Sequence, residues 1–147
     1  MLSATTIGAL NRLLAIHCRS FPQYLQYARP YVTGAGGEKL QIIEQIAEDQ
    51  QQLSDRIATM LQTADQTPNT GRFPMEFTDT HDLSIDFLLG EAVKYQREDI
   101  EAIEACALRL KNLPDGFALA EEALGMAKGH LHCLEEVVAE TAGAAVS

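Results

Sequence analysis

Apolar residues recur at spacings of three and four along four stretches of the chain, a pattern that predicts four amphipathic helices. The stretches cover about residues 5–31, 38–62, 81–111 and 117–140. Pro22 lies inside the first stretch, where its missing amide donor predicts a kink. The tail after the fourth stretch is expected to be frayed. The pattern therefore predicts an all-α fold, a four-helix bundle in a single domain that spans residues 1–147.

The connections between these helices differ in length. Short turns at residues 33–37 and 112–116 make their flanking helices pair as antiparallel hairpins. Residues 63–80 form a much longer link, which contains an apolar group from Phe73 to Phe77 and can return along the whole bundle. We therefore expect a long crossover between the second and third helices. Asp79 or Thr80 is the expected cap of the third helix, and Asp115 that of the fourth.

Each inward-facing stripe is apolar except for one polar residue near the middle of its helix. These four residues are His17, Gln50, Gln96 and His130. Because antiparallel hairpins bring the midpoints of the helices to one level, we expect a single polar layer inside an apolar core. Buried polar groups must satisfy one another, so hydrogen bonds between imidazole and amide side chains are the expected contacts.

The first two helices resemble those of bacterial ferritin-like proteins. In that superfamily two helices each supply one Glu, and two others each supply a Glu-x-x-His motif. Residues 10–17 resemble the first helix, with His17 at the Glu position. Residues 46–57 resemble the second, with Gln50 and Leu53 at the Glu and His positions.

The resemblance continues through the second half of the chain. Residues 73–77, leading into residues 81–89, resemble the crossover and the start of the third helix, and Gln96 falls where that helix carries Glu. Residues 126–131 resemble the fourth helix, with Ala127 in place of Glu and with His130 retained. The similarity covers residues 10–138 in all and implies the ferritin-like arrangement with its crossover.

The metal ligands of this superfamily are the part that the sequence lacks. No Glu-x-x-His motif occurs in the chain. Two iron ions bring roughly four to six positive charges into a low-dielectric core, and carboxylates are needed to neutralise them. Two amides, two imidazoles, Ala127 and Leu53 do not supply that charge, so no di-iron cofactor is expected. His17 and His130, with Cys18 or Cys133 nearby, remain candidates for a single soft divalent metal ion.

Net charge and cysteine usage narrow the classes of partner. The formal net charge is -10, which disfavours nucleic-acid binding. No apolar run is long enough to span a bilayer, and the first residues do not resemble a signal peptide, so a cytoplasmic protein is expected. Cys18, Cys106 and Cys133 are too few and too far apart for a disulfide framework, and we expect them to act as small buried apolar residues.

Two further groups of polar residues could form a metal site or an interface, but their positions favour a solvated helix face. His132 and Glu135 share a helix face beside the inward stripe, which favours a solvated pair over a metal site. Glu91, Tyr95 and Glu98 line one face of the third helix, which is expected to be solvated or to form an interface.

Three functions remain open on these grounds. The favoured one is a non-catalytic bundle that acts through its surface, as a homodimer or by binding a protein partner, with the apolar group from Phe73 to Phe77 as a candidate patch. The alternatives are a metal-dependent oxidase or iron-handling protein with other ligands, and a binder of small molecules in a cavity beside the polar layer. The residues expected in the core are Leu14, Ile46, Ile57, Leu89, Val93, Ile100, Ile103, Leu124 and Leu134.

Overall fold

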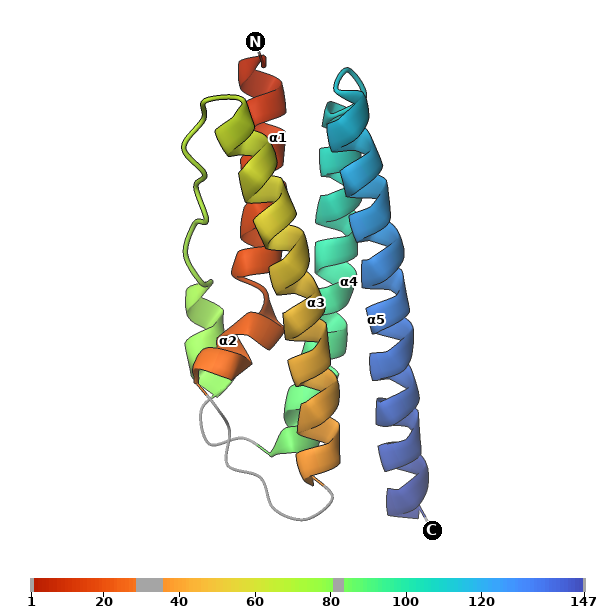
Figure 1. Cartoon of the computed structure of the whole chain (residues 1–147). Helices are drawn as coiled ribbons and strands as arrows, with labels where there is room; N and C mark the ends of the chain where they lie inside the picture. The colour runs from red at the N-terminus through yellow and green to blue at the C-terminus, as the bar shows by residue number, and fades with distance from the viewer. Residues whose placement is uncertain (1, 29–35, 81–83, 147) are drawn as a thin grey trace.

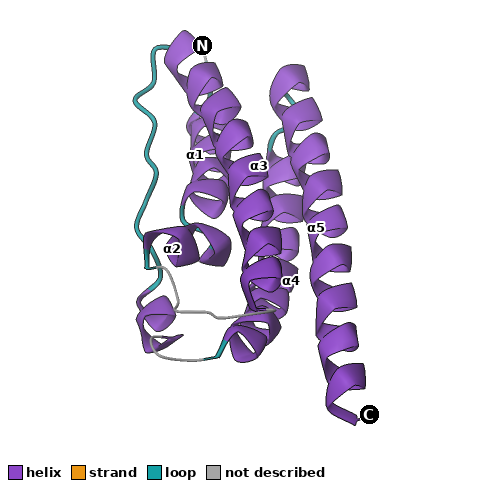
Figure 2. Ribbon diagram, turned by 60° about the horizontal axis from the view of Figure 1, so that its bottom comes forward, coloured by secondary structure: helices purple, strands orange, loops and turns teal. Residues whose placement is uncertain are grey.

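The computed structural model describes residues 2–28, 36–80 and 84–146. Within these ranges the chain is helical and has no strand; its elements are α1 (Ala4–Cys18), α2 (Phe21–Tyr27), α3 (Gly36–Thr63), η1 (Met75–Thr80), α4 (Ile85–Arg109) and α5 (Pro114–Val146). Four of the helices, α1, α3, α4 and α5, lie side by side as a bundle (Figure 1). The short helix α2 runs across the bundle instead of along it (Figure 2).

The direction of the helices confirms the expected crossover. In Figure 1, α1 descends and α3 ascends, and the link after α3 then returns along the outside of the bundle. Helix α4 therefore starts at the same end as α3 and ascends parallel to it, and α5 descends to the C-terminus. The second and third long helices are thus parallel, an arrangement that only a long connection permits.

The first predicted helix is divided into two, which corrects the expectation of one kinked helix over residues 5–31. Helix α1 ends at Cys18, and the side-chain oxygen of Ser20 accepts a hydrogen bond from Gln23 N at 3.3 Å to cap α2. Pro22 lies in the first turn of α2, where its missing amide donor costs nothing. The proline therefore starts a new helix instead of bending an old one. The end of the expected helix falls in residues 29–35, outside the described part of the chain.

Three other helix ends differ from the sequence-based expectation. Helix α4 begins at Ile85 and is capped by Ser84, whose side-chain oxygen accepts a hydrogen bond from Phe87 N at 3.2 Å, whereas Asp79 and Thr80 belong to η1. Helix α5 begins at Pro114, so Asp115 lies in its first turn and is not the cap. The same helix continues to Val146, so the tail that we expected to be frayed is helical.

The crossover is fastened to α1 before it reaches η1. Asn69 N donates to Asn11 Oδ1 at 2.8 Å, and Arg19 Nε donates to the carbonyl of Gly71 at 3.1 Å. Gly71 has a φ of 71°, a conformation that side chains rarely adopt, and a Cβ there would lie 3.4 Å from Cβ of Ala15. Glycine is therefore favoured here by the backbone conformation, at the point where the crossover lies against α1.

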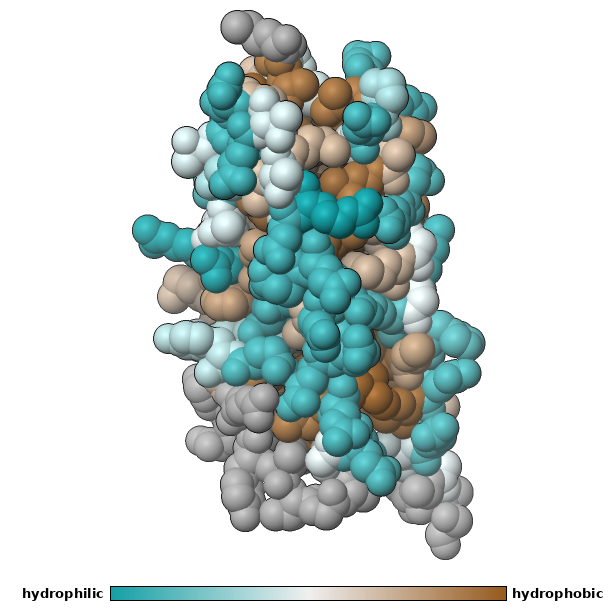
Figure 3. Space-filling model, viewed as in Figure 1, coloured by the Kyte–Doolittle hydropathy of each residue, from teal (hydrophilic) through white to brown (hydrophobic). Residues whose placement is uncertain are grey.

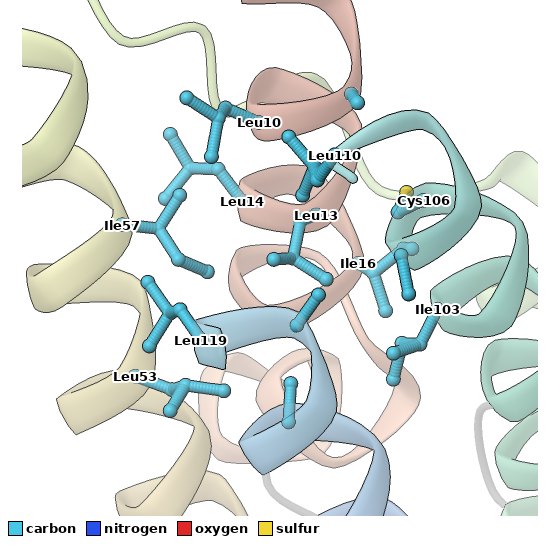
Figure 4. Packing of buried hydrophobic residues seen from close by; sticks show 14 of the residues in the cluster. Leu10, Leu13, Leu14, Ile16, Leu53, Ile57, Ile103, Cys106, Leu110 and Leu119 are labelled. Atoms are coloured by element: carbon cyan, nitrogen blue, oxygen red, sulfur yellow. The ribbon is translucent and has the colours of Figure 1, made fainter. Parts of the chain in front are cut away.

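The buried apolar residues fall into two clusters, one in each half of the bundle. The upper cluster takes residues 9–16 of α1, 53–61 of α3, 100–107 of α4 with Leu110 just after it, and 119–127 of α5. Figure 4 shows side chains of this cluster converging from the surrounding helices. The lower cluster surrounds α2 and is rich in aromatic rings; its buried members are Phe21, Tyr24, Leu25, Ile43, Ile46, Phe77, Leu88, Leu89, Ala92, Val93, Tyr95 and Leu134.

Most of the predicted core is confirmed. Eight of the nine residues named from the sequence are at most 9% exposed, and only Leu124 is half-buried. The expectation that all three cysteines are buried is correct for Cys106 alone. Cys18 is half-buried and Cys133 is exposed. The inward position in that turn of α5 belongs to Leu134, one residue further along.

The surface that faces the viewer in Figure 3 is mostly hydrophilic along α3, and apolar surface gathers in the seam between α3 and α5. In the described part of the chain no helix combines the length and the apolar character that crossing a membrane requires.

Candidate functional site

The four polar residues named from the sequence separate the two apolar clusters. In α3, Gln50 lies between Ile46 of the lower cluster and Leu53 of the upper one. Gln96 of α4 and His130 of α5 lie between the same two clusters, and His17 lies in the last turn of α1, just before the lower cluster begins. We call these four residues the polar layer. Each is at most 9% exposed, so the expected buried layer is present.

His17 is held by its own helix. Its Nδ1 donates to the carbonyl oxygen of Leu13 at 2.8 Å, because a carbonyl can only accept. Burial lowers the pKa of His17, the hydrogen bond to Leu13 opposes this, and the nearby His130 lowers the pKa further. The ring is therefore neutral at pH 7, with the lone pair on Nε2.

Gln50 and Gln96 are both satisfied by groups other than histidine. The hydroxyl of Ser20 donates to Gln50 Oε1 at 2.6 Å, and Ser54 Oγ donates to the backbone carbonyl of Gln50 at 2.9 Å. Gln96 Nε2 donates to the carbonyl of Ala127 at 3.0 Å. The prediction of hydrogen bonds between the imidazole and amide side chains is therefore wrong. The hydrogen bonds of the two amides and of the α1 imidazole go to a serine hydroxyl and to backbone carbonyls of the helices.

His130 reaches the rim of the layer. Its Nε2 donates to Oδ2 of Asp49 at 2.9 Å, and the side chain of Asp49 is 34% exposed. The other ring nitrogen, Nδ1, is buried and has no hydrogen-bond partner among the described residues. In the neutral ring this nitrogen carries the lone pair. His17 and His130 are therefore both oriented by a hydrogen bond on one nitrogen, the geometry that metal-binding histidines share.

These residues do not fit a di-iron centre. Leu53 and Ala127, at two of the expected ligand positions, belong to the apolar upper cluster. Asp49 is the carboxylate that contacts the layer, and its oxygen already accepts from His130. In the described residues no three His, Cys, Asp or Glu side chains are grouped as metal ligands would be. Two iron ions would therefore lack the negative charge that stabilises them.

The other sequence candidates lie outside the layer. His132 Nε2 contacts Glu136 at 3.0 Å on the exposed face of α5, and Glu135 pairs instead with Arg97. Tyr95 is only 6% exposed, which corrects the expectation that it lies on a solvated face.

Sequence periodicity missed two partners of the layer, Ser20 and Asp49. Ser20 was hidden because the helix break was not foreseen, although a serine followed two residues later by a proline is a helix-start signal. Asp49 is one residue before Gln50 and so points to the edge of the stripe, where no periodic pattern distinguishes it from a surface acid.

The arrangement of helices is similar to that of a known protein. A solved structure described as a ferritin-like, diiron-carboxylate protein from Bacillus anthracis strain Ames superimposes with a TM-score of 0.76, over 93% of this chain and 99% of that chain, at 18% sequence identity. No protein-family model and no curated protein matches the sequence. The fold of this chain is therefore ferritin-like, whereas its chemistry has to be argued from its own residues.

Proposed function

We propose that this chain is a non-catalytic ferritin-like bundle that has lost the di-iron centre and acts through its surface, as a homodimer or by binding a protein partner. The observation that carries the proposal is the composition of the polar layer. Its four side chains are two amides and two imidazoles, and they bind serine, backbone carbonyls and one rim aspartate. A protein that used this layer for iron would require carboxylates at the same positions.

The layer has a structural use without metal. Each of its polar side chains makes a hydrogen bond that connects neighbouring segments or closes a helix turn, which offsets the cost of burying it. Gln50 connects α3 to the start of α2, and Gln96 connects α4 to α5. Such contacts fix how the helices are aligned along their axes, which an apolar core alone specifies less well.

A surface patch next to α2 supports association. Tyr27 is 83% exposed and Met75 is 87% exposed, and the ring centroids of Tyr27 and Phe73 are 6.4 Å apart. We call these three residues the α2 patch. Phe77, which the sequence placed in the same apolar group, is instead buried and anchors the patch to the lower cluster. Large exposed side chains gathered in this way are typical of contact surfaces.

The net charge and the free thiols indicate which class of partner and which compartment suit this chain. A net charge of -10 opposes binding to nucleic acid, and the free thiols of Cys18, Cys106 and Cys133 suit the reducing cytoplasm.

Metal content and iron oxidation test the loss of the centre. The protein is purified without chelator, its iron and zinc are measured, and Fe(II) is then added in air while the absorbance of ferric species is followed. We expect much less than one iron per chain and no oxidation above the rate in buffer. Two irons per chain at stoichiometric loading would overturn the proposal.

Sedimentation tests the surface. We expect a dimer at tens of micromolar that is weakened when Tyr27 and Met75 are both replaced by Ser, whereas the same replacement of exposed Leu108, at 65% exposure on α4, leaves it intact. If the wild-type protein is a monomer and also captures no partner from cell extract, the proposal that it acts through its surface is wrong.

A further inference from the structure

A cleft lies where the crossover passes over α1 and α4. Its volume is about 210 Å³, and its walls come from α1, from the crossover with the start of η1, and from α4. None of the four residues of the polar layer lines it. The cleft is therefore a second site, separate from the place where ferritin-like proteins carry metal. We call it the crossover cleft.

Positive charge gathers in this cleft although the chain is strongly acidic. Arg12, Arg19 and Arg72 all line it. Arg19 is committed to the crossover, since it donates to Gly71 and to Thr70 Oγ1. Arg12 and Arg72 make no hydrogen bond or ion pair with any residue that the structure describes. Two guanidinium groups, one from α1 and one from the crossover, are thus available to a ligand.

The remaining wall gives the cleft an acid and an apolar surface. Asp99 lines it from α4, and burial raises the pKa of this carboxyl to about 7, which Arg12 opposes and Glu98 reinforces. Near neutral pH a large share of Asp99 is therefore protonated and able to donate a hydrogen bond. Ile16 and the ring of Phe77 supply apolar surface beside these polar groups.

We propose that the crossover cleft binds a small monocarboxylate, whose oxygens accept hydrogen bonds from Arg12 and Arg72 and whose apolar body lies against Phe77. Guanidinium groups recognise a carboxylate by paired, charge-assisted hydrogen bonds. The volume suits a compact ligand, because a cavity of about 150 Å³ already holds benzene.

The charge of the cleft selects a monoanion. Its three guanidinium groups face the carboxylates Glu76 and Glu98, which leaves one positive charge while Asp99 is protonated. A single carboxylate balances that charge. A phosphate dianion would add a negative charge close to two fixed carboxylates, so it is disfavoured.

Protonation of Asp99 links binding to pH. The charged and titratable groups that face it are Arg12 on α1 and Arg19 just after that helix, Arg72 and Glu76 on the crossover and η1, and Tyr95 and Glu98 on α4. The acid form donates to the bound carboxylate, whereas the ionised form repels it. With half-protonation near pH 7, the competent fraction falls roughly tenfold between pH 6 and pH 8, and the affinity falls with it.

Calorimetric titration with benzoate tests the proposal, with benzamide as the neutral analogue of the same shape. We expect one benzoate per chain, roughly tenfold tighter at pH 6 than at pH 8, and no detectable benzamide binding. Arg12→Gln and Arg72→Gln should each weaken benzoate binding by at least about tenfold. Lys111→Gln, which removes the same charge from an exposed position, should bind as the wild type does.

The variant Asp99→Asn tests whether Asp99 affects binding through its protonation or only through its contribution to the structure. An amide donates a hydrogen bond at every pH, so this variant should bind benzoate with an affinity that no longer changes between pH 6 and pH 8. Absence of benzoate binding to folded wild-type protein at millimolar concentration overturns the proposal, as does unchanged binding by both arginine variants. Inorganic phosphate that binds more tightly than benzoate also overturns it. None of these results depends on iron content or on dimer formation.

Discussion

The hydroxyl of Ser20 donates a 2.6 Å hydrogen bond to Oε1 of Gln50 and so joins the start of α2 to the middle of α3. Both side chains are at most 4% exposed. Ser20 also caps α2 through the amide of Gln23. One short contact therefore fixes both the place where the first helix breaks and its height along α3.

Replacing Gln50 by Leu should destabilise the protein by about 1–3 kcal/mol, because the buried hydroxyl of Ser20 loses its acceptor. Urea unfolding followed by circular dichroism measures this change. Gln52→Leu is the matched control, since Gln52 is exposed on the same helix, and it should change stability by less than about 0.5 kcal/mol. Equal effects at both positions would contradict the role of Gln50.

Two neighbouring residues of α5 test which face of that helix is buried. Leu134→Ala should cost about 2–5 kcal/mol, since Leu134 is fully buried in the lower cluster. Cys133→Ala should lie within about 0.5 kcal/mol of the wild type because Cys133 is exposed. Thermal melts of the two variants give the comparison, and a reversed order would mean that α5 is rotated.

Asp99 should make stability fall as pH rises. Its pKa is raised to about 7 in the folded protein from 3.8, so the folded state binds more protons than the unfolded state between these values. Stability is therefore lost progressively from about pH 4 to pH 7 and then stays low as far as this group is concerned. Asp99→Asn should be more stable than the wild type at pH 8, by about 1.4 kcal/mol for each pKa unit of the shift.

The gain of Asp99→Asn should disappear at about pH 3, where the wild-type carboxyl is neutral in the folded state and mostly neutral in the unfolded state. Denaturant unfolding at the two pH values tests this. An advantage of the variant that is the same at both would show that ionisation of Asp99 is not its cause.

Rebuilding the carboxylates should create iron binding. The variant carries Glu at positions 17, 50, 96 and 127 and His at position 53, and keeps His130. Metal analysis after anaerobic Fe(II) loading should give up to two irons per chain, against almost none in the parent. A loaded variant that melts higher with iron than without it excludes surface adsorption. A folded variant that binds no iron would show that the layer is not aligned as the resemblance implies.

Sequence periodicity predicted the interior polar residues because a buried helix face repeats regularly over many turns. Gln50, Gln96 and His130 lie in long helices and were placed correctly. The pattern failed where one residue decides the outcome. Cys133 and Leu134 are neighbours about 100° apart around α5, and an error of one position exchanges inside for outside. Asp99 looks like any other acid of α4 in the sequence, since its burial depends on a crossover that is distant along the chain.

The gathering of aromatic rings around α2 has a consequence for spectroscopy. The chain has no tryptophan, and three of its four tyrosines, Tyr24, Tyr27 and Tyr95, lie at the α2 end of the bundle, where the rings of Tyr24 and Tyr95 pack against Phe77; the fourth, Tyr31, lies outside the described residues. Near-ultraviolet circular dichroism from these tyrosines therefore reports on the lower half alone, whereas the far-ultraviolet signal reports on every helix. The protein thus carries a built-in local probe, and recording both signals in one melt reveals whether the two halves unfold together.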